Sequence, residues 1–231
     1  MDVSNYLILA AVIVAMSWWH RRLKRQQQLQ ELLRYRFHPS IANKVRKRYP
    51  HLNEEQSQQV MEGLRDFFWC CAKAGNKPVA MPSQAVDVAW HEFILFTRAY
   101  ERFCKQALGR FLHHTPTEVM SSPTDAQPAI KRAWRLACAR ESLNPKFPAH
   151  LPALFAMDAR LSIEDGFFYS LNCQSNSGRG AAADSYCASH IGCSSGCAGV
   201  SGNSDSGGFF SSDSHSSDSN SGCSSCSGGG D

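Results

Sequence analysis

The chain has 231 residues, a formal net charge of +4 and 43% hydrophobic residues. Its last quarter contains too few large apolar residues to build a core, which excludes a second folded domain there. One domain of roughly 120 residues remains, an ordinary size for an independently folding unit.

Charge is distributed unevenly along the chain. Residues 20–50 contain ten Lys or Arg and one acid, residues 51–172 contain thirteen of each sign, and residues 173–231 contain five Asp and one Arg. The basic excess therefore follows directly after the apolar N-terminal residues.

Residues 1–20 are predicted to be a transmembrane anchor. Val3 to Trp19 are seventeen residues without a charge, and a helix of this length spans about 25 Å, at the short end for a bilayer. A cleaved signal peptide is the alternative, but it carries positive charge before its apolar stretch, whereas here the bases follow it. The positive-inside rule then predicts a single-pass membrane protein whose C-terminal domain is cytoplasmic.

Residues 21–50 are interpreted as a basic juxtamembrane segment that continues the helix. Bases beside an anionic leaflet each contribute on the order of 1 kcal/mol of attraction. A solvated collar that only fixes topology is the alternative, and no nucleic-acid partner is expected because the segment lacks a recognisable reading motif. The residues predicted to face lipid are Arg21, Arg22, Lys24, Arg25, Arg46, Lys47 and Arg48.

Residues 51–172 are predicted to form a helical domain, because they show helix start and stop signals without a convincing alternating strand pattern. Asn53 begins a capping box, and Gly75 stands where that helix would end. Its expected apolar stripe comprises Val60, Leu64, Phe67, Phe68 and Cys71.

The longest helix of this domain is expected to start after Ser83, to run without a break to Leu108 and to end at Gly109. We expect this helix to be the centre of the core. Its apolar seam is Val86, Trp90, Phe93, Thr97, Tyr100, Cys104 and Ala107.

Two shorter helices are expected after it. One starts near Pro128, a residue suited to a first turn, and buries Trp134. The other spans His150 to Leu161.

Four cysteines of the domain are interpreted as small buried apolar residues: Cys70, Cys71, Cys104 and Cys138.

Residues 173–231 are rich in Ser, Gly and Cys and are predicted to be disordered, which completes an all-α fold class with an anchor, a small helical domain and a tail. Cys223 and Cys226 have the spacing of a metal or dithiol pair. The alternative is a flexible linker whose cysteines stay reduced.

The candidate chemistry lies around Asp87 and His91, which are four residues apart on one helical face. His113 and His114 follow just past Gly109, and carboxylate with imidazole suits zinc or another divalent metal. An unbroken helix would put its end about 27 Å from His91, so a shared site requires the helix to break early. The alternative is that Asp87 accepts a hydrogen bond near the helix N-terminus and His91 packs in the core.

A family resemblance rests on the same residues. Asp87-Val88-Ala89-Trp90-His91 resembles the Asp-x-x-Trp-His core of the glycine-rich domain-containing protein-like family. The resemblance implies a helical domain without an established enzymatic activity. Family members commonly read Trp-His-x-His-Gln, whereas Glu92 and Phe93 follow His91 here. The candidate motif residues are Asp87, Trp90, His91, Tyr100, Cys104 and His114.

Two functional hypotheses follow, and neither assigns a catalytic residue. The first is a membrane-tethered, non-enzymatic interaction or scaffold module that binds an unknown protein partner. The second is a metal-binding protein or metal-dependent enzyme that uses Asp87, His91 and His114. The sequence contains no phosphate-binding loop, dinucleotide fingerprint or nucleophile elbow, which favours the first hypothesis.

Overall fold

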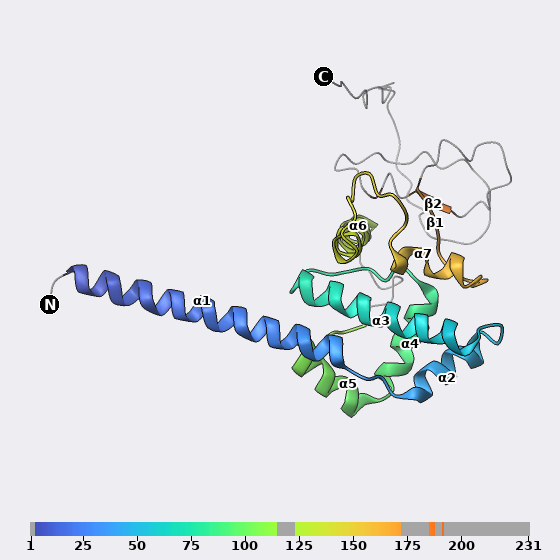
Figure 1. Cartoon of the computed structure of the whole chain (residues 1–231), viewed down its shortest axis with the longest axis horizontal. Helices are drawn as coiled ribbons and strands as arrows, with labels where there is room; N and C mark the ends of the chain where they lie inside the picture. Colours follow the sequence, from blue (N-terminus) through green and yellow to red (C-terminus); the bar gives the residue numbers. More distant parts are fainter. Residues whose placement is uncertain (1–2, 115–122, 172–184, 188–190, 192–231) are drawn as a thin grey trace, which may run out of the picture. The chain divides into compact units, whose positions relative to one another are not determined.

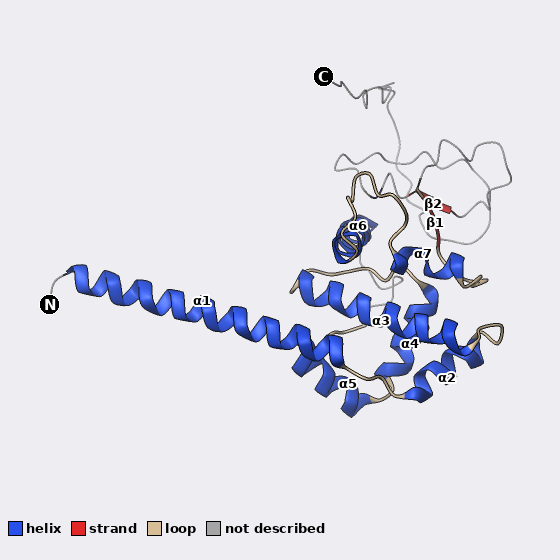
Figure 2. Ribbon diagram, viewed as in Figure 1, coloured by secondary structure: helices blue, strands red, loops and turns tan. Residues whose placement is uncertain are grey.

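The structure, a computed structural model, describes residues 3–114, 123–171, 185–187 and 191. This part of the chain is mostly helical, as predicted (Figures 1 and 2). The elements are α1 (Val3–Arg34), α2 (Pro39–Arg48), α3 (Glu54–Ala74), α4 (Gln84–Ile94), α5 (Thr97–Phe103), the π-helical η1 (Cys104–Leu108), α6 (Pro123–Arg140), α7 (Ala153–Arg160), β1 (Phe168–Ser170) and β2 (Ser185–Cys187).

Helix α3 is the element that contacts most of the others, namely α1, α2, α4, α6, α7 and η1. It starts at the predicted capping box: the Asn53 side chain accepts from the Gln56 amide at 2.7 Å, and the Asn53 amide donates to the Gln56 side chain at 2.9 Å. The predicted apolar stripe of α3 is buried. The centre of the core is thus α3 rather than the helix that follows Ser83.

Gly63 lets two helices approach α3 closely. A Cβ atom at this position would lie 2.9 Å from the Val86 side chain of α4 and 2.9 Å from the Met157 side chain of α7. A larger residue would therefore press on the branched Val86 side chain of α4, whereas the flexible end of Met157 could move aside.

The helix predicted to run unbroken from Ser83 to Leu108 is interrupted, which corrects that prediction. Helix α4 starts after Ser83 as expected, but it ends at Ile94, and α5 starts at Thr97. The backbone leaves the helical region at Phe96, with φ −81° and ψ 57°.

Aromatic packing explains this break. In a continuous helix Phe93 and Phe103 would be about 15 Å apart along the axis, whereas their ring centroids here are 5.3 Å apart. Phe93 also packs edge-on against Tyr100 at 5.2 Å. Folding α5 back onto α4 buries these rings together, and each aromatic pair contributes about 0.5–1.5 kcal/mol beyond its buried area.

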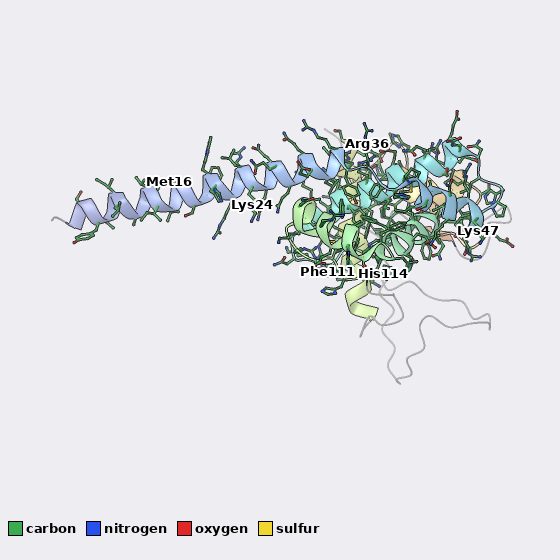
Figure 3. The ribbon with its side chains drawn as sticks, turned by 90° about the horizontal axis from the view of Figure 1, so that it is seen from below. Met16, Lys24, Arg36, Lys47, Phe111 and His114 are labelled. Carbon is green, nitrogen blue, oxygen red and sulfur yellow. The ribbon has the colours of Figure 1, made fainter. Side chains whose placement is uncertain are left out.

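The prediction that residues 1–20 form a membrane anchor does not agree with the properties of helix α1. Among the helices of the described residues, none combines the length and the apolar character needed to cross a bilayer. The apolar residues of α1 fall short of the roughly 20 that a spanning helix needs, and the helix continues into a polar, basic half that ends at Arg34. The prediction of a single-pass membrane protein with a cytoplasmic domain is therefore wrong. Side chains project on all sides of α1 around Met16 (Figure 3) and are exposed.

The C-terminal end of the segment 21–50 contributes to the core of the domain. Leu32, Ile41 and Val45 are almost fully buried. The predicted lipid-facing bases are divided between α1 and α2. On α2, Arg48 pairs with Asp165 at 2.9 Å. The lipid contact of these bases stays a prediction.

The C-terminal part of the domain differs in detail from expectation. Helix α6 begins at Pro123, before the predicted start at Pro128, and buries Trp134 as predicted. Helix α7 is shorter than the predicted segment. Strand β1 pairs in parallel with β2, which lies within residues 173–231 and was not predicted. Most of that segment lies outside the described residues.

Asp158 of α7 holds the N-terminus of α4 in place. Its buried carboxylate accepts hydrogen bonds from the Ser83 hydroxyl at 2.6 Å, from the amides of Gln84 and Ala85 at 2.7 and 3.2 Å, and from the Phe167 amide at 2.9 Å. A carboxylate at a helix N-terminus also complements the helix dipole. One buried side chain therefore joins α7, α4 and the segment before β1.

Replacing Asp158 tests this role. Asp158→Ala leaves several buried donors unpaired, at about 1–3 kcal/mol each, so the free energy of unfolding should fall by about 3 kcal/mol or more. Urea unfolding of the full chain measures the change. The control is Asp66→Ala, which removes a partly exposed pair with Arg140 and should cost about 1 kcal/mol or less. Equal losses in the two variants would contradict the assignment.

Candidate metal centre

Asp87 and His91 lie one turn apart on α4 with their side chains turned toward each other. The Oδ2 atom of Asp87 is 3.1 Å from Nδ1 of His91. This spacing follows from the four-residue separation, because residues i and i+4 of a helix are neighbours on its surface. The sequence predicted this convergence of two side chains, and their role as metal ligands stays a prediction.

His114 completes the site from a distant part of the chain. Its Nε2 atom is 3.0 Å from Oδ1 of Asp87, and its ring centroid is 4.1 Å from that of His91. The ring also packs edge-on against Trp90 at 4.5 Å. His114 donates a hydrogen bond to Asp87 in the tautomer that carries the proton on Nε2.

The turn at Gly109 directs the chain back toward α4. Gly109 has a left-handed backbone, with φ +71°. A Cβ atom here would clash with the Gln28 side chain of α1. The flexible end of Gln28 could move aside, so it is the left-handed backbone that favours glycine at this position.

A buried hydrogen-bond relay fixes the segment 109–114 against α4 and α5. Trp90 Nε1 donates to the Tyr100 hydroxyl at 3.1 Å, and this hydroxyl donates to the Leu112 carbonyl at 2.5 Å. Burial raises the pKa of Tyr100, so the hydroxyl keeps the proton that it donates. The relay thereby anchors the chain two residues before His114.

The three side chains form a cluster with the composition and size of a metal site. One ligand atom from each of Asp87, His91 and His114 lies within 4.8 Å of the other two. Ligand atoms bound tetrahedrally at about 2.1 Å from zinc are roughly 3.4 Å apart. The two Asp–His distances involve different carboxylate oxygens, Oδ2 toward His91 and Oδ1 toward His114. A metal would therefore draw one ligand atom of each residue from within 4.8 Å to about 3.4 Å of the others.

The cluster borders a cleft of about 550 Å³. The side chain of His114 is 14% exposed and that of Asp87 is 19% exposed, whereas that of His91 is 52% exposed. A small molecule can therefore approach the three ligand atoms from the cleft. Phe67, Trp90 and Leu112 supply apolar parts of its wall.

Basic residues that the sequence did not single out also line this cleft. They are Lys77, from the loop after α3, and Arg110, which follows the turn at Gly109. The sequence signal available for Arg110 was its position four residues before His114. That signal has meaning only once the chain is known to fold back onto α4.

His113 and the cysteines lie outside the cluster. His113 is exposed, and its ring packs against the Phe111 ring at 4.8 Å. Burial raises the pKa of the Cys71 and Cys104 thiols, although the Arg110 guanidinium acts in the opposite direction. A protonated thiol is a poor nucleophile and a poor metal ligand. Cys223 and Cys226 lie outside the described residues.

Fold and site together define an all-α domain with an Asp–His–His cluster beside a cleft. The chain matches the UCP032817-like family over residues 25–191, more than half of its length, and belongs to that family. No curated protein and no solved structure matches the chain. The matched residues include Asp87, His91 and His114. The resemblance to the glycine-rich domain-containing protein-like family stays a prediction.

The relay through Tyr100 can be tested by removing one oxygen. Tyr100→Phe leaves the buried Trp90 donor and the Leu112 acceptor without their partner, so the free energy of unfolding should fall by about 2 kcal/mol. Tyr49→Phe is the control, because the Tyr49 hydroxyl makes a single bond to the exposed Asp165. Chemical denaturation measures both variants. A loss no greater for Tyr100→Phe than for Tyr49→Phe would show that the relay contributes little.

Proposed function

We propose that the protein binds a divalent metal ion, zinc in first place, through Asp87, His91 and His114. The observation that carries this proposal is the convergence of the three ligand atoms within 4.8 Å across the break between α4 and α5. Histidine from a segment 23 residues beyond His91 reaches the same point as a pair that is already one turn apart.

The chemistry of the ligands favours zinc. Zinc binds imidazole nitrogen and carboxylate oxygen and has no geometric preference from its d electrons, so it accepts a site assembled from one helix and one loop. Three protein ligands leave the fourth position for water or another molecule, as in catalytic zinc sites. Two histidines and one carboxylate also suit iron(II), which the experiment below includes.

Hydrogen bonding alone is the competing explanation of the cluster. Distances of 3.0 and 3.1 Å also fit a carboxylate that accepts from two imidazoles. A carboxylate hydrogen-bonded to two imidazoles needs no metal, whereas a metal site needs a coordination position that another molecule can reach. The position of the cluster on a cleft and the exposure of His91 support the metal site.

The interaction-module hypothesis stays a second candidate. Exposed apolar side chains on α1 favour it, among them Leu7, Ile8 and Val14. Contiguous exposed apolar surface commonly marks contact with another molecule. We rank it below metal binding because the exposed residues define a surface without a specific partner.

Metal binding is tested by titrating the metal-free full chain with zinc, cobalt(II) and iron(II). His114→Gln should lower the zinc affinity at least about 100-fold, because loss of an outer-shell partner alone costs 10–100-fold. The matched control is His113→Gln, which changes the adjacent histidine outside the cluster and should leave the affinity within about two-fold of the unchanged protein. Competition with a chromophoric chelator measures the affinities.

The many cysteines of the chain require a second readout. Cobalt bound to Asp87, His91 and His114 should show visible absorption of a four-coordinate site without the near-ultraviolet band of a thiolate ligand. The double variant Cys223→Ser, Cys226→Ser should leave the visible absorption unchanged. Equal zinc affinity in His114→Gln and His113→Gln, or cobalt absorption dominated by thiolate, would overturn the proposal.

A further inference from the structure

Positive charge dominates the cleft beside the Asp87–His91–His114 cluster. Among the described residues that line it, Lys77 and Arg110 are basic, and Asp87 is the one acid. A divalent ion bound to Asp87 would leave the cleft with a strong excess of positive charge. Such a cleft attracts anions, because the low-dielectric walls concentrate the field.

Arg110 is a half-buried base without an acceptor in the part of the chain that the structure describes. Its side chain forms no hydrogen bond or ion pair with another residue among those that the structure describes. Other arginines of the domain behave differently, since Arg48 and Arg140 each pair with an aspartate. The Arg110 guanidinium therefore keeps its donors available to a molecule in the cleft.

The reach of the segment 109–114 places this arginine close to the cluster. Arg110 and His114 are four residues apart, so their Cα atoms are separated by at most about 14 Å. Both side chains line the same cleft. A small molecule can therefore contact Arg110 with one group while another part lies at the cluster.

We propose that the cleft binds a small molecule with a phosphate monoester group, held by Arg110 and Lys77 beside the metal at Asp87, His91 and His114. This inference deepens the proposed metal site and rests on it. A phosphate monoester carries close to two negative charges at neutral pH and offers three acceptor oxygens, which matches two bases and a metal. The planar guanidinium of Arg110 donates two parallel hydrogen bonds to such a group.

The inference is tested by calorimetric titration of the zinc-loaded full chain with inorganic phosphate and with phenyl phosphate. Acetate is titrated in parallel to compare a carboxylate with a phosphate. Arg110→Gln should weaken phosphate binding at least about ten-fold, because hydrogen bonds to charged groups are lost. Lys77→Gln should weaken it several-fold. Arg110→Lys, which keeps the charge and loses the two-pronged geometry, should fall between Arg110→Gln and the unchanged protein.

Arg102→Gln is the matched control, because Arg102 is exposed and its Nε atom donates to the Arg98 carbonyl outside the cleft. It should leave phosphate affinity unchanged. The zinc content of every variant is measured alongside and should stay at the level of the unchanged protein. Zinc content tests the proposed metal site and phosphate affinity tests the present inference, so failure of one can be told from failure of the other.

Four results would overturn the phosphate inference, of which the first three concern the site as a whole. These three are equal phosphate affinity in zinc-loaded Arg110→Gln and Arg102→Gln, tighter binding of acetate than of phosphate, and phosphate binding that is the same with and without zinc. Phenyl phosphate binding at least as tight as that of inorganic phosphate supports an ester ligand. Binding of inorganic phosphate alone would assign the cleft to the free ion instead and would also overturn the inference.

Discussion

The break between α4 and α5 is the constraint on which the site depends. The chain leaves the helical conformation at Phe96, and α5 folds back so that Tyr100 and Phe103 pack against Phe93. A continuous helix would carry the following loop far from His91. Because the break shortens that path, the segment 109–114 returns to α4 and delivers His114 to Asp87.

Two buried polar connections make this arrangement specific. Asp158 holds the N-terminus of α4, the helix that carries the first two site residues. The Tyr100 hydroxyl holds Leu112, two residues before the third. Apolar packing alone tolerates small shifts, whereas buried hydrogen bonds are directional and costly to leave unmade. Together these bonds fix both sides of the cluster from outside it.

Local signals predicted much of the fold. The capping box at Asn53, the cap at Ser83 and the apolar stripe of α3 each depend on residues within a few positions of one another. The break after Ile94 has no such signal, because neither Leu95 nor Phe96 is glycine or proline. Its cause is a tertiary contact between rings, which no local pattern contains.

The same distinction between local signals and tertiary contacts applies to the residues of the candidate site. Asp87 and His91 were predictable because they share a helical face, whereas His114 required the break. The roles of Asp158 and Arg110 depend on partners more than 30 residues away in the sequence or on a cleft that exists only in the folded chain. The anchor prediction failed because the uncharged run is short, and no helix among the described residues has both the length and the apolar character to cross a bilayer.

The coordination environment of bound zinc tests the central claim most directly. Zinc-edge X-ray absorption of the full chain loaded with one equivalent of zinc gives the ligand types and their distances. The account predicts a shell of nitrogen and oxygen at about 2.0–2.2 Å with the outer-shell scattering of two imidazoles. A shell dominated by sulfur at about 2.3 Å would place the metal on cysteines and contradict the assignment to Asp87, His91 and His114.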